Sequence, residues 1–304
     1  MPAQKLLIAC LMFSLLSFWA CRPFRSAPLA VPAAFDWQGH RGCRGLMPEN
    51  TLPAFLHALS FPQLTTLELD LAVSKDGQLI VSHEPWFNPA ICRRPGGDTI
   101  PVREAEQTLL YRLTAAQIRD YDCGSWGNAR FTQQQRQPAY KPTLREVVQA
   151  VRAQSPHMRW NMEIKSELAW DGLRHPPVEE FVRLLADELK ALGIEEQSTV
   201  QSFDVRALQA MRRRAPHLTL ALLVENTDGL AANLRRLGFT PPIYSPYYAS
   251  VNPRLVRQCR ARSMRLIPWT VNDTASMRAL IRLGVDGIIT DYPNLIAELG
   301  QGDK

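Results

Sequence analysis

Residues 66–83, TLELDLAVSKDGQLIVSH, carry the pattern that decides the fold. Side chains alternate between the two faces of a strand, so Glu68 and Asp70 share one face while the leucines at 67, 69 and 71 share the other. A strand buried on both faces is typical of a parallel sheet covered by helices. Two carboxylates in one interior are costly to bury unpaired, so the pattern predicts a positive partner. The alternative is an exposed strand at a sheet edge, with both carboxylates in water.

The same stretch contains a turn. Ser74-Lys75-Asp76-Gly77 holds the Asp-Gly pair that favours a tight hairpin between strands at 66–73 and 78–83. A short turn joins antiparallel strands, whereas parallel strands need a long crossover. We therefore expect one barrel strand with a hairpin appendage.

Outward from this stretch, short apolar runs alternate with amphipathic segments, which predicts repeated β-α units. Strands are expected at 36–42, 159–165, 199–203, 218–224, 243–246, 265–270 and 287–290, and helices at 48–60, 143–154, 177–192, 204–214, 229–237, 253–263 and 274–283. This order predicts the α/β class and a TIM (β/α)8 barrel, which typically needs about 250 of the 304 residues. Residues 84–142, rich in Pro, Gly and Gln, interrupt the rhythm and are expected to form an insertion at the C-terminal mouth of the barrel.

A second alternation lies at residues 159–165, RWNMEIK, where Asn161, Glu163 and Lys165 share a face. It adds a third inward carboxylate to Glu68 and Asp70, beside an inward cation. Three carboxylates suit a hard cation such as Mg²⁺ or Ca²⁺ better than zinc. A structural ion pair between Glu163 and Lys165 is the alternative.

Two histidines fall at predicted strand ends, the catalytic face of such barrels. His40 follows the first strand and His83 ends the strand after the Asp-Gly turn. A pair of histidines suits acid and base roles near neutral pH. Arg41, next to His40, and Lys165 could hold phosphate oxygens, so the set fits an anionic phosphoryl substrate.

The N-terminus has the pattern of an export signal. Lys5 precedes an apolar run, residues 6–20, that is too short to span a bilayer. Ala20-Cys21 resembles a bacterial lipoprotein cleavage site, with ordinary signal cleavage as the alternative. We expect a signal peptide at 1–21, a linker at 22–34 and one domain at 35–304. The protein is expected to be exported, as a periplasmic protein or a lipoprotein tethered to the membrane through Cys21.

In an oxidising compartment disulfides are permitted. Cys92 and Cys123 lie in the same irregular region and could pair; free buried thiols are the alternative. The net charge of +6 comes from scattered arginines rather than one stripe, so we expect no nucleic-acid partner.

A set of motifs in order along the chain resembles the glycerophosphodiester phosphodiesterases. They are Gly39-His40-Arg41-Gly42, Pro48-Glu49-Asn50-Thr51, Glu68-Leu69-Asp70, Lys75-Asp76-Gly77, His83, Glu163-Ile164-Lys165, Gln201-Ser202-Phe203, Trp269-Thr270-Val271-Asn272 and residues 284–293, GVDGIITDYP. The resemblance covers nearly the whole chain from Trp37 to about Leu299.

This resemblance implies a barrel phosphodiesterase with its insertion after the third barrel strand. Glu68, Asp70 and Glu163 would ligate one divalent cation, Ca²⁺ or Mg²⁺. His40 and His83 would be the acid–base pair, Arg41 and Lys165 would hold the phosphate, and Trp269 would line the glycerol side. A glycerol hydroxyl would attack phosphorus, and a cyclic phosphate would then be opened by water. The products would be glycerol 3-phosphate and an alcohol.

The chain departs from the family pattern at the mouth, because His83 is followed by Glu84 rather than by Asp. Two other functions therefore stay open. One is a phospholipase D-like enzyme acting on sphingolipids or lysophospholipids, which an apolar mouth around Trp86, Phe87 and Trp126 would favour. The other is a lipoprotein that binds phosphodiesters without cleaving them, against which the retention of every catalytic position argues.

Overall fold

The computed structural model describes residues 29 and 31–300. The predicted signal peptide, Cys21 and most of the predicted linker lie outside these residues. Among the described residues the strands are β1 (Asp36–Gly39), β2 (Thr66–Val73), β3 (Leu79–Val81), β4 (Arg159–Ile164), β5 (Ser198–Ser202), β6 (Thr219–Val224), β7 (Ile243–Pro246), β8 (Arg265–Leu266) and β9 (Gly287–Thr290). The helices that cover the ring are α1 (Leu52–Ala58), α4 (Leu144–Arg152), α5 (Val178–Leu192), α6 (Val205–Arg214), α7 (Leu230–Leu237), α8 (Pro253–Arg260) and α9 (Thr274–Leu283).

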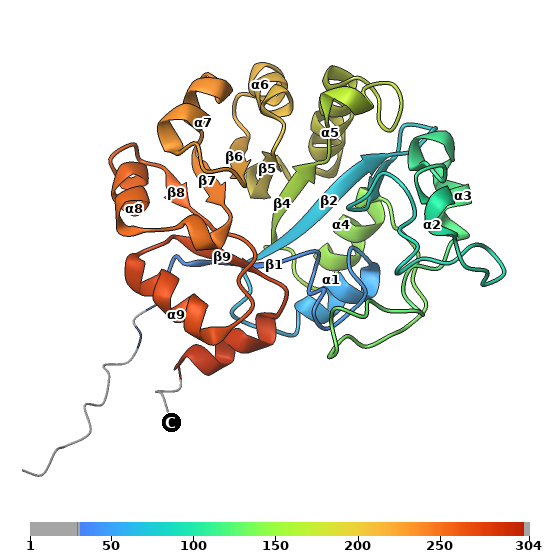
Figure 1. Cartoon of the computed structure of the whole chain (residues 1–304), viewed down its shortest axis with the longest axis horizontal. Helices are drawn as coiled ribbons and strands as arrows, with labels where there is room; N and C mark the ends of the chain where they lie inside the picture. The colour runs from blue at the N-terminus through green and yellow to red at the C-terminus, as the bar shows by residue number, and fades with distance from the viewer. Residues whose placement is uncertain (1–28, 30, 301–304) are drawn as a thin grey trace, which may run out of the picture.

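The strands form a parallel barrel with the helices around it (Figure 1). Their order is β8-β7-β6-β5-β4-β2-β1-β9, and β3 pairs antiparallel with β2 off this path. Single backbone hydrogen bonds join the two ends of the sheet: Asp286 donates to Leu266 at 2.9 Å and Ile289 to Pro268 at 3.0 Å. The predicted (β/α)8 barrel and its hairpin appendage are confirmed.

The predicted strand at 265–270 is too long, because β8 ends at Leu266. Proline at position 268 has no N–H to donate, so a regular ladder stops there. The backbone still runs between its neighbours, since Trp269 donates to Pro246 at 3.1 Å and Val271 to Ile289 at 3.0 Å.

The insertion follows the third strand of the chain, β3, but this strand is not one of the eight in the ring. Counted around the barrel, residues 84–142 separate the second strand, β2, from the third, β4. The hairpin explains the difference, because β3 turns back along β2 and cannot join a parallel ring.

The insertion is more regular than its composition indicates. It contains α2 (Val102–Ala105), η1 (Leu110–Arg112) and α3 (Ala115–Arg119), each too short to show helical periodicity. Cys92 and Cys123 form a disulfide within a small core that includes Phe87, Leu110 and Ile118. The pairing that the sequence left open is therefore present.

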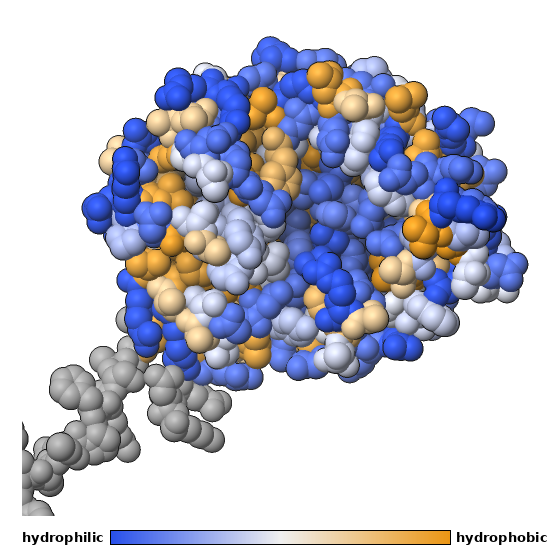
Figure 2. Space-filling model, in the orientation of Figure 1, coloured by the Kyte–Doolittle hydropathy of each residue, from blue (hydrophilic) through white to orange (hydrophobic). Residues whose placement is uncertain are grey.

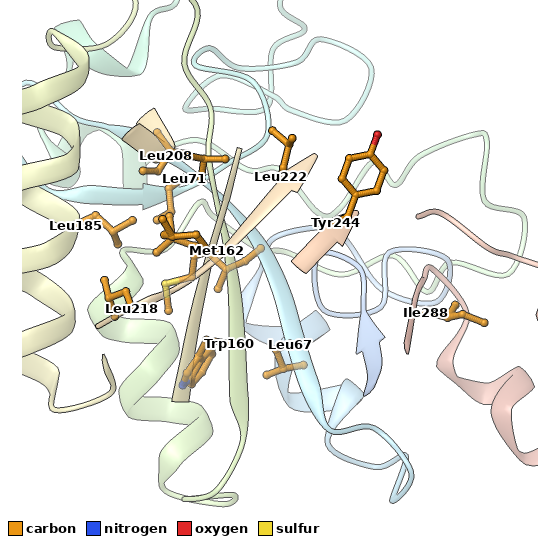
Figure 3. Close-up of a cluster of buried hydrophobic side chains, with 14 of the residues drawn as sticks. Leu67, Leu71, Trp160, Met162, Leu185, Leu208, Leu218, Leu222, Tyr244 and Ile288 are labelled. Carbon is orange, nitrogen blue, oxygen red and sulfur yellow. The ribbon is translucent and has the colours of Figure 1, made fainter. Parts of the chain in front are cut away.

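The main core lies between the barrel and its helices. Leu67 and Leu71 face outward, where Figure 3 shows them among buried side chains such as Leu185 of α5 and Leu208 of α6. The other face of β2 carries Glu68 and Asp70, both buried, into the barrel interior. The alternation predicted from 66–73 is thus what separates the core from the polar interior.

Figure 2 shows hydrophilic side chains gathered around a hollow near the middle of the face that it presents. Among the residues that the structure describes, no helix is both long and apolar enough to cross a membrane.

Candidate active site

Strand register brings the three predicted carboxylates together. In the pairing of β2 with β4, Asp70 lies opposite Glu163 and Glu68 opposite Asn161. One oxygen from each of Glu68, Asp70 and Glu163 lies within 4.8 Å of the others, and all three residues are buried. The exposed-edge alternative for Glu68 and Asp70 is therefore wrong.

Arg41 is the principal positive partner of this cluster. Its Nε lies 3.1 Å from Asp70 Oδ2, its Nη1 donates to Glu49 Oε1 at 2.6 Å, and its backbone N–H donates to Glu68 Oε2 at 2.9 Å. Lys165 Nζ lies 2.9 Å from Glu163 Oε1. The positive partner that the strand pattern predicts beside the buried carboxylates is confirmed. It consists of two side chains, Arg41 and Lys165.

A tight loop aims the backbone of Arg41 at Glu68. Arg41 has φ of 51°, in the left-handed region. Gly39 and Gly42 flank the His40-Arg41 pair. A Cβ at Gly39 would lie 2.1 Å from the carbonyl oxygen of Gly42, so only glycine lets the chain fold back this closely. The Gly-His-Arg-Gly sequence thus has a backbone reason as well as a chemical one.

The three carboxyl groups differ in how readily they ionise. Burial, followed by the charge of Asp70, raises the pKa of Glu68 well above its usual range. Burial also raises the pKa of Glu163, although Lys165 opposes the shift. Burial works against Asp70 too, yet Arg41 holds the pKa of that carboxyl well below its usual range. Glu68 and Glu163 are therefore harder to ionise here than in water, and a bound cation would favour their charged forms.

The donor set fits a hard divalent cation. Asp70 Oδ1 is buried and has no hydrogen-bond partner among the described residues. Asn50 Nδ2 donates to the other Asp70 oxygen at 2.8 Å, and Gln201 Nε2 donates to Glu68 Oε1 at 2.9 Å, so both carboxylates are oriented. Oxygen ligands without sulfur or imidazole in the set suit Mg²⁺ or Ca²⁺.

His40 is held by Asp291, a buried carboxylate that was not among the predicted site residues. His40 Nδ1 lies 2.6 Å from Asp291 Oδ1, while Arg44 Nε and Asn272 Nδ2 donate to the same carboxylate at 2.6 and 2.7 Å. Burial and Arg44 lower the pKa of His40 to about 4, against the opposing effect of Asp291. The ring is therefore neutral near pH 7. Its Nδ1–H donates to Asp291, and its Nε2 can accept a proton.

His83 reaches the site because β3 turns back along β2. Ser82 N donates to Asp70 O at 2.9 Å, which sets the following residue at the level of the carboxylates. His83 Nε2 lies 3.2 Å from Lys165 Nζ, and its Nδ1 lies 3.2 Å from Glu84 Oε1. Burial opposes the ionisation of Glu84, but its hydrogen bond with His83 lowers its pKa to about 2.

The insertion contributes a buried cation beneath His83. Lys141 Nζ donates to Ser82 Oγ at 2.7 Å, and Ser82 Oγ donates to Glu84 O at 2.6 Å. Burial lowers the pKa of Lys141, although Glu84 partly offsets the shift. These hydrogen bonds therefore fix the backbone segment that carries His83.

Two neighbouring cavities open on these residues. A small one of about 110 Å³ is bordered by His40, Glu68 and Trp269, and a larger one of about 420 Å³ by Glu84, Trp86 and Trp170. The residues that both cavities share are His83, Glu163, Lys165 and Phe203. The site therefore has room on each side of His83.

Trp269 lines the small cavity, as the resemblance implies, and its indole Nε1 donates to Ser245 O at 2.9 Å. The apolar mouth that would favour the phospholipase D-like alternative forms only in part. Trp86 lines the larger cavity, but Phe87 is buried in the insertion and stacks on Tyr121, and Trp126 packs under Arg93.

Asp291, Arg44, Asn50 and Gln201 were not among the predicted site residues. Asp291 and Gln201 occur in the quoted motifs, so a signal was present, but their partners lie 251 and 133 positions away in sequence. Only the closed barrel identifies those contacts.

Comparison with known proteins gives concordant matches. The model of the glycerophosphoryl diester phosphodiesterase family matches residues 40–295. A glycerophosphodiester phosphodiesterase of Caldanaerobacter subterraneus subsp. tengcongensis is 30% identical over 262 residues, covering 86% of this chain and 95% of that protein. One from Bacillus subtilis is 29% identical over 276 residues, covering 86% and 85%.

Solved structures agree with the fold. A protein from Silicibacter pomeroyi, provisionally named glycerophosphoryl diester phosphodiesterase, has a TM-score of 0.79 and 28% identity, covering 91% of this chain and 95% of that one. An Oleispira antarctica phosphodiesterase, solved with the product sn-glycerol-3-phosphate, has a TM-score of 0.69 at 22% identity, with 88% and 96% covered. The family match includes every predicted site residue from His40 to Trp269.

Proposed function

The chain belongs to the glycerophosphoryl diester phosphodiesterase family, and on that premise we propose that it hydrolyses glycerophosphodiesters to glycerol 3-phosphate and an alcohol with the help of a divalent cation. It is a phosphoric diester hydrolase, so the non-catalytic alternative is set aside. The observation that carries the proposal is the buried Glu68, Asp70 and Glu163 cluster, with two histidines at its border and a cavity on either side.

Substrate binding rests on charge. In this proposal Arg41 and Lys165 hold the phosphodiester anion, since both line the small cavity beside the carboxylates. Glu68, Asp70 and Glu163 would hold one Mg²⁺ or Ca²⁺. Such an ion polarises phosphoryl oxygens and stabilises the charge that develops in the transition state.

The two histidines would divide the proton transfers. His40 lines only the small cavity with Trp269, so its free Nε2 would take the proton of the attacking glycerol hydroxyl. His83 borders both cavities, so it would protonate the oxygen of the leaving alcohol. Glu84 and Lys165 flank the His83 ring, and the carboxylate offers a partner for its imidazolium form.

The reaction then balances in two displacements. The glycerol oxygen forms a bond to phosphorus as the bond to the leaving oxygen breaks, and a cyclic phosphate and the free alcohol result. Water next attacks phosphorus, with His83 now as the base, and the released glycerol oxygen takes its proton from His40. Trp269 packs where the glycerol carbons would lie, beside Phe203 at a ring-centroid distance of 5.4 Å.

Release of glycerol 3-phosphate from glycerophosphocholine by the purified protein tests this function. EDTA should stop the release and added Mg²⁺ or Ca²⁺ should restore it. His40→Ala and His83→Ala should each lower kcat by about 10²- to 10⁴-fold. His217→Ala is the matched control, because His217 is exposed and pairs with Glu195 away from both cavities. Near-full activity in both active-site variants would overturn the mechanism.

The phospholipase D-like alternative predicts release of choline from sphingomyelin or lysophosphatidylcholine but not from glycerophosphocholine. The same assays distinguish it, because each product is measured separately. Only Trp86 of the three aromatic residues expected at an apolar mouth lines the larger cavity, so the structure supports this alternative less than the sequence does.

We further propose that the protein is exported and tethered to a bacterial membrane through lipidated Cys21. The support is the charged start, the apolar run at 6–20 and the Ala20-Cys21 pair. Globomycin should cause the unprocessed precursor to accumulate, and Cys21→Ala should abolish lipid labelling. If globomycin does not affect processing, the lipidation proposal is wrong and the signal is removed by ordinary signal cleavage.

A further inference from the structure

The larger cavity beside the catalytic residues has no role in binding phosphate or glycerol. Its volume of about 420 Å³ is within the usual range for small-molecule sites. It meets the small cavity at His83 and Lys165, so a group that leaves from phosphorus on the His83 side would enter it. The side chains that form its walls therefore determine which leaving alcohol binds best.

Aromatic side chains from two separate segments form the wall. Trp86 follows His83 at the start of the insertion, and Trp170 lies in η2 (Leu168–Trp170) after β4. Their rings meet edge to face with centroids 6.0 Å apart, and Phe203, which follows β5, completes the lining with 41% of its surface exposed. Three aromatic rings thus surround a space that opens to solvent.

This wall is fixed in place. The Arg174 guanidinium lies 4.9 Å from the Trp86 ring centroid and 5.1 Å from that of Trp170, and its Nη2 donates to Glu106 at 2.6 Å. Buried His175 accepts a hydrogen bond from Glu167 N at 3.2 Å, which ties down the loop that carries Trp170. A pre-formed aromatic wall can bind a ligand without first being ordered.

The charges around the cavity favour a cation. Glu84, Glu163 and Glu167 line it, and the side chain of Glu167 is exposed with no ionic or hydrogen-bond partner among the described residues. The two nearby cations are already paired: Lys165, which lines the cavity, with Glu163 at 2.9 Å, and Arg174, which packs on both tryptophan rings, with Glu106 at 2.6 Å. A carboxylate without a partner beside aromatic faces is the environment that recognises quaternary ammonium groups.

We propose that this cavity binds the leaving alcohol and selects alcohols that carry a trimethylammonium group, so that choline diesters are the preferred substrates. The proposal rests on the proposed hydrolase function. Trp86 and Trp170 contact the cationic head, Glu167 supplies the opposing charge, and His83 stands at the oxygen that leaves. A neutral alcohol of similar size gains only van der Waals contact from the same walls.

The experiment compares kcat/KM for glycerophosphocholine and glycerophosphoglycerol, which share the glycerol phosphate and differ in the leaving alcohol. Wild type should prefer the choline diester. Trp86→Leu and Trp170→Leu should each lower kcat/KM for that diester by about 5- to 30-fold, mostly through KM. Both variants should stay within about twofold of wild type on the glycerol diester, because its neutral head lacks the cation–π term.

Two further variants sharpen the result. Glu167→Lys should weaken inhibition of the enzyme by added free choline. It should also reduce the preference for the choline diester, and more so at low salt than at high salt. Trp126→Leu is the control, because Trp126 is another tryptophan of the insertion but is exposed and packs under Arg93, outside both cavities. Thermal melts of every variant separate loss of folding from loss of selectivity.

The outcomes are distinguishable. If wild type cleaves neither diester, the proposed function and this inference fail together. If wild type cleaves both but shows no choline preference, or if the tryptophan variants lose activity equally on both, the inference alone is wrong. A loss confined to acylated substrates, with glycerophosphocholine unaffected, would identify an acyl-chain site and also overturn it.

Discussion

Among single residues, Asp291 is fully buried behind His40 and positions the proposed base. It follows β9 and takes hydrogen bonds from Arg44 and Asn272 while it holds Nδ1 of His40. Burial opposes its charge, but His40 and Arg44 keep the pKa of Asp291 well below its usual range. A permanently ionised carboxylate at Nδ1 fixes both the tautomer and the orientation of the ring.

We therefore expect Asp291→Asn to lower kcat by roughly 10²- to 10³-fold with little change in KM, because an amide can present its N–H to Nδ1 and favour the wrong tautomer. Steady-state kinetics on glycerophosphocholine measure the split. Asp273→Asn is the control, because Asp273 is a helix cap that asparagine replaces well. A change in KM or melting temperature alone would reduce Asp291 to a structural residue.

The lowered pKa of His40 also affects stability. Its folded-state pKa of about 4 lies below the ordinary value of 6.5, so between these pH values the unfolded chain binds more protons than the folded one. Stability from this group is then complete above pH 6.5 and falls toward pH 4, with a slope of up to about 1.4 kcal/mol per pH unit. Urea unfolding from pH 4 to 7.5 should give a shallower slope in His40→Asn. Equal slopes would exclude the shift.

At the scale of elements, the alternation in 66–73 and 159–165 was enough to predict which residues of β2 and β4 enter the barrel interior. Those strands are buried on both faces, so period and charge determine the side. The end of β8 was not predictable from local hydropathy, because Pro268 interrupts the ladder within an apolar run. The contacts of Asp291 form only when the barrel closes, so a local pattern does not show them. The helices of the insertion are too short to show a helical period.

The stability of the insertion depends strongly on the Cys92–Cys123 disulfide. Cys92 and Cys123 are 31 residues apart, and the core that they share is small. Loss of the disulfide, as Cys92→Ser with Cys123→Ser, should cost about 4 kcal/mol by the loop-entropy estimate. Because Trp86 and Lys141 flank this region, activity should fall with insertion stability. Melting with and without dithiothreitol measures the effect, and identical curves for wild type and variant in non-reducing buffer would contradict it.

At the scale of the whole molecule, the barrel collects onto one mouth side chains that lie in, or directly after, β1, β2, β4, β5 and β9. Parallel strands share one direction, so their carboxyl ends meet on the same face however far apart they lie in sequence. This arrangement also gathers three buried carboxyl groups in one place, and burial raises the pKa of two of them, Glu68 and Glu163. The folded chain therefore bears a cost in the absence of a cation.

This cost predicts how the whole chain responds to metal. A cation that binds only the folded state adds about 2.7 kcal/mol of stability at a concentration one hundred times Kd, which for a domain of this size raises Tm by about 5 to 10 °C. Glu68→Gln should abolish most of that rise, yet its Tm in EDTA should equal or exceed that of wild type, because one buried charge has been removed. Calorimetric titration with Mg²⁺ and Ca²⁺, beside Glu195→Gln as a surface control, separates the two effects. A rise in Tm that persists unchanged in Glu68→Gln would remove Glu68 from the ligand set.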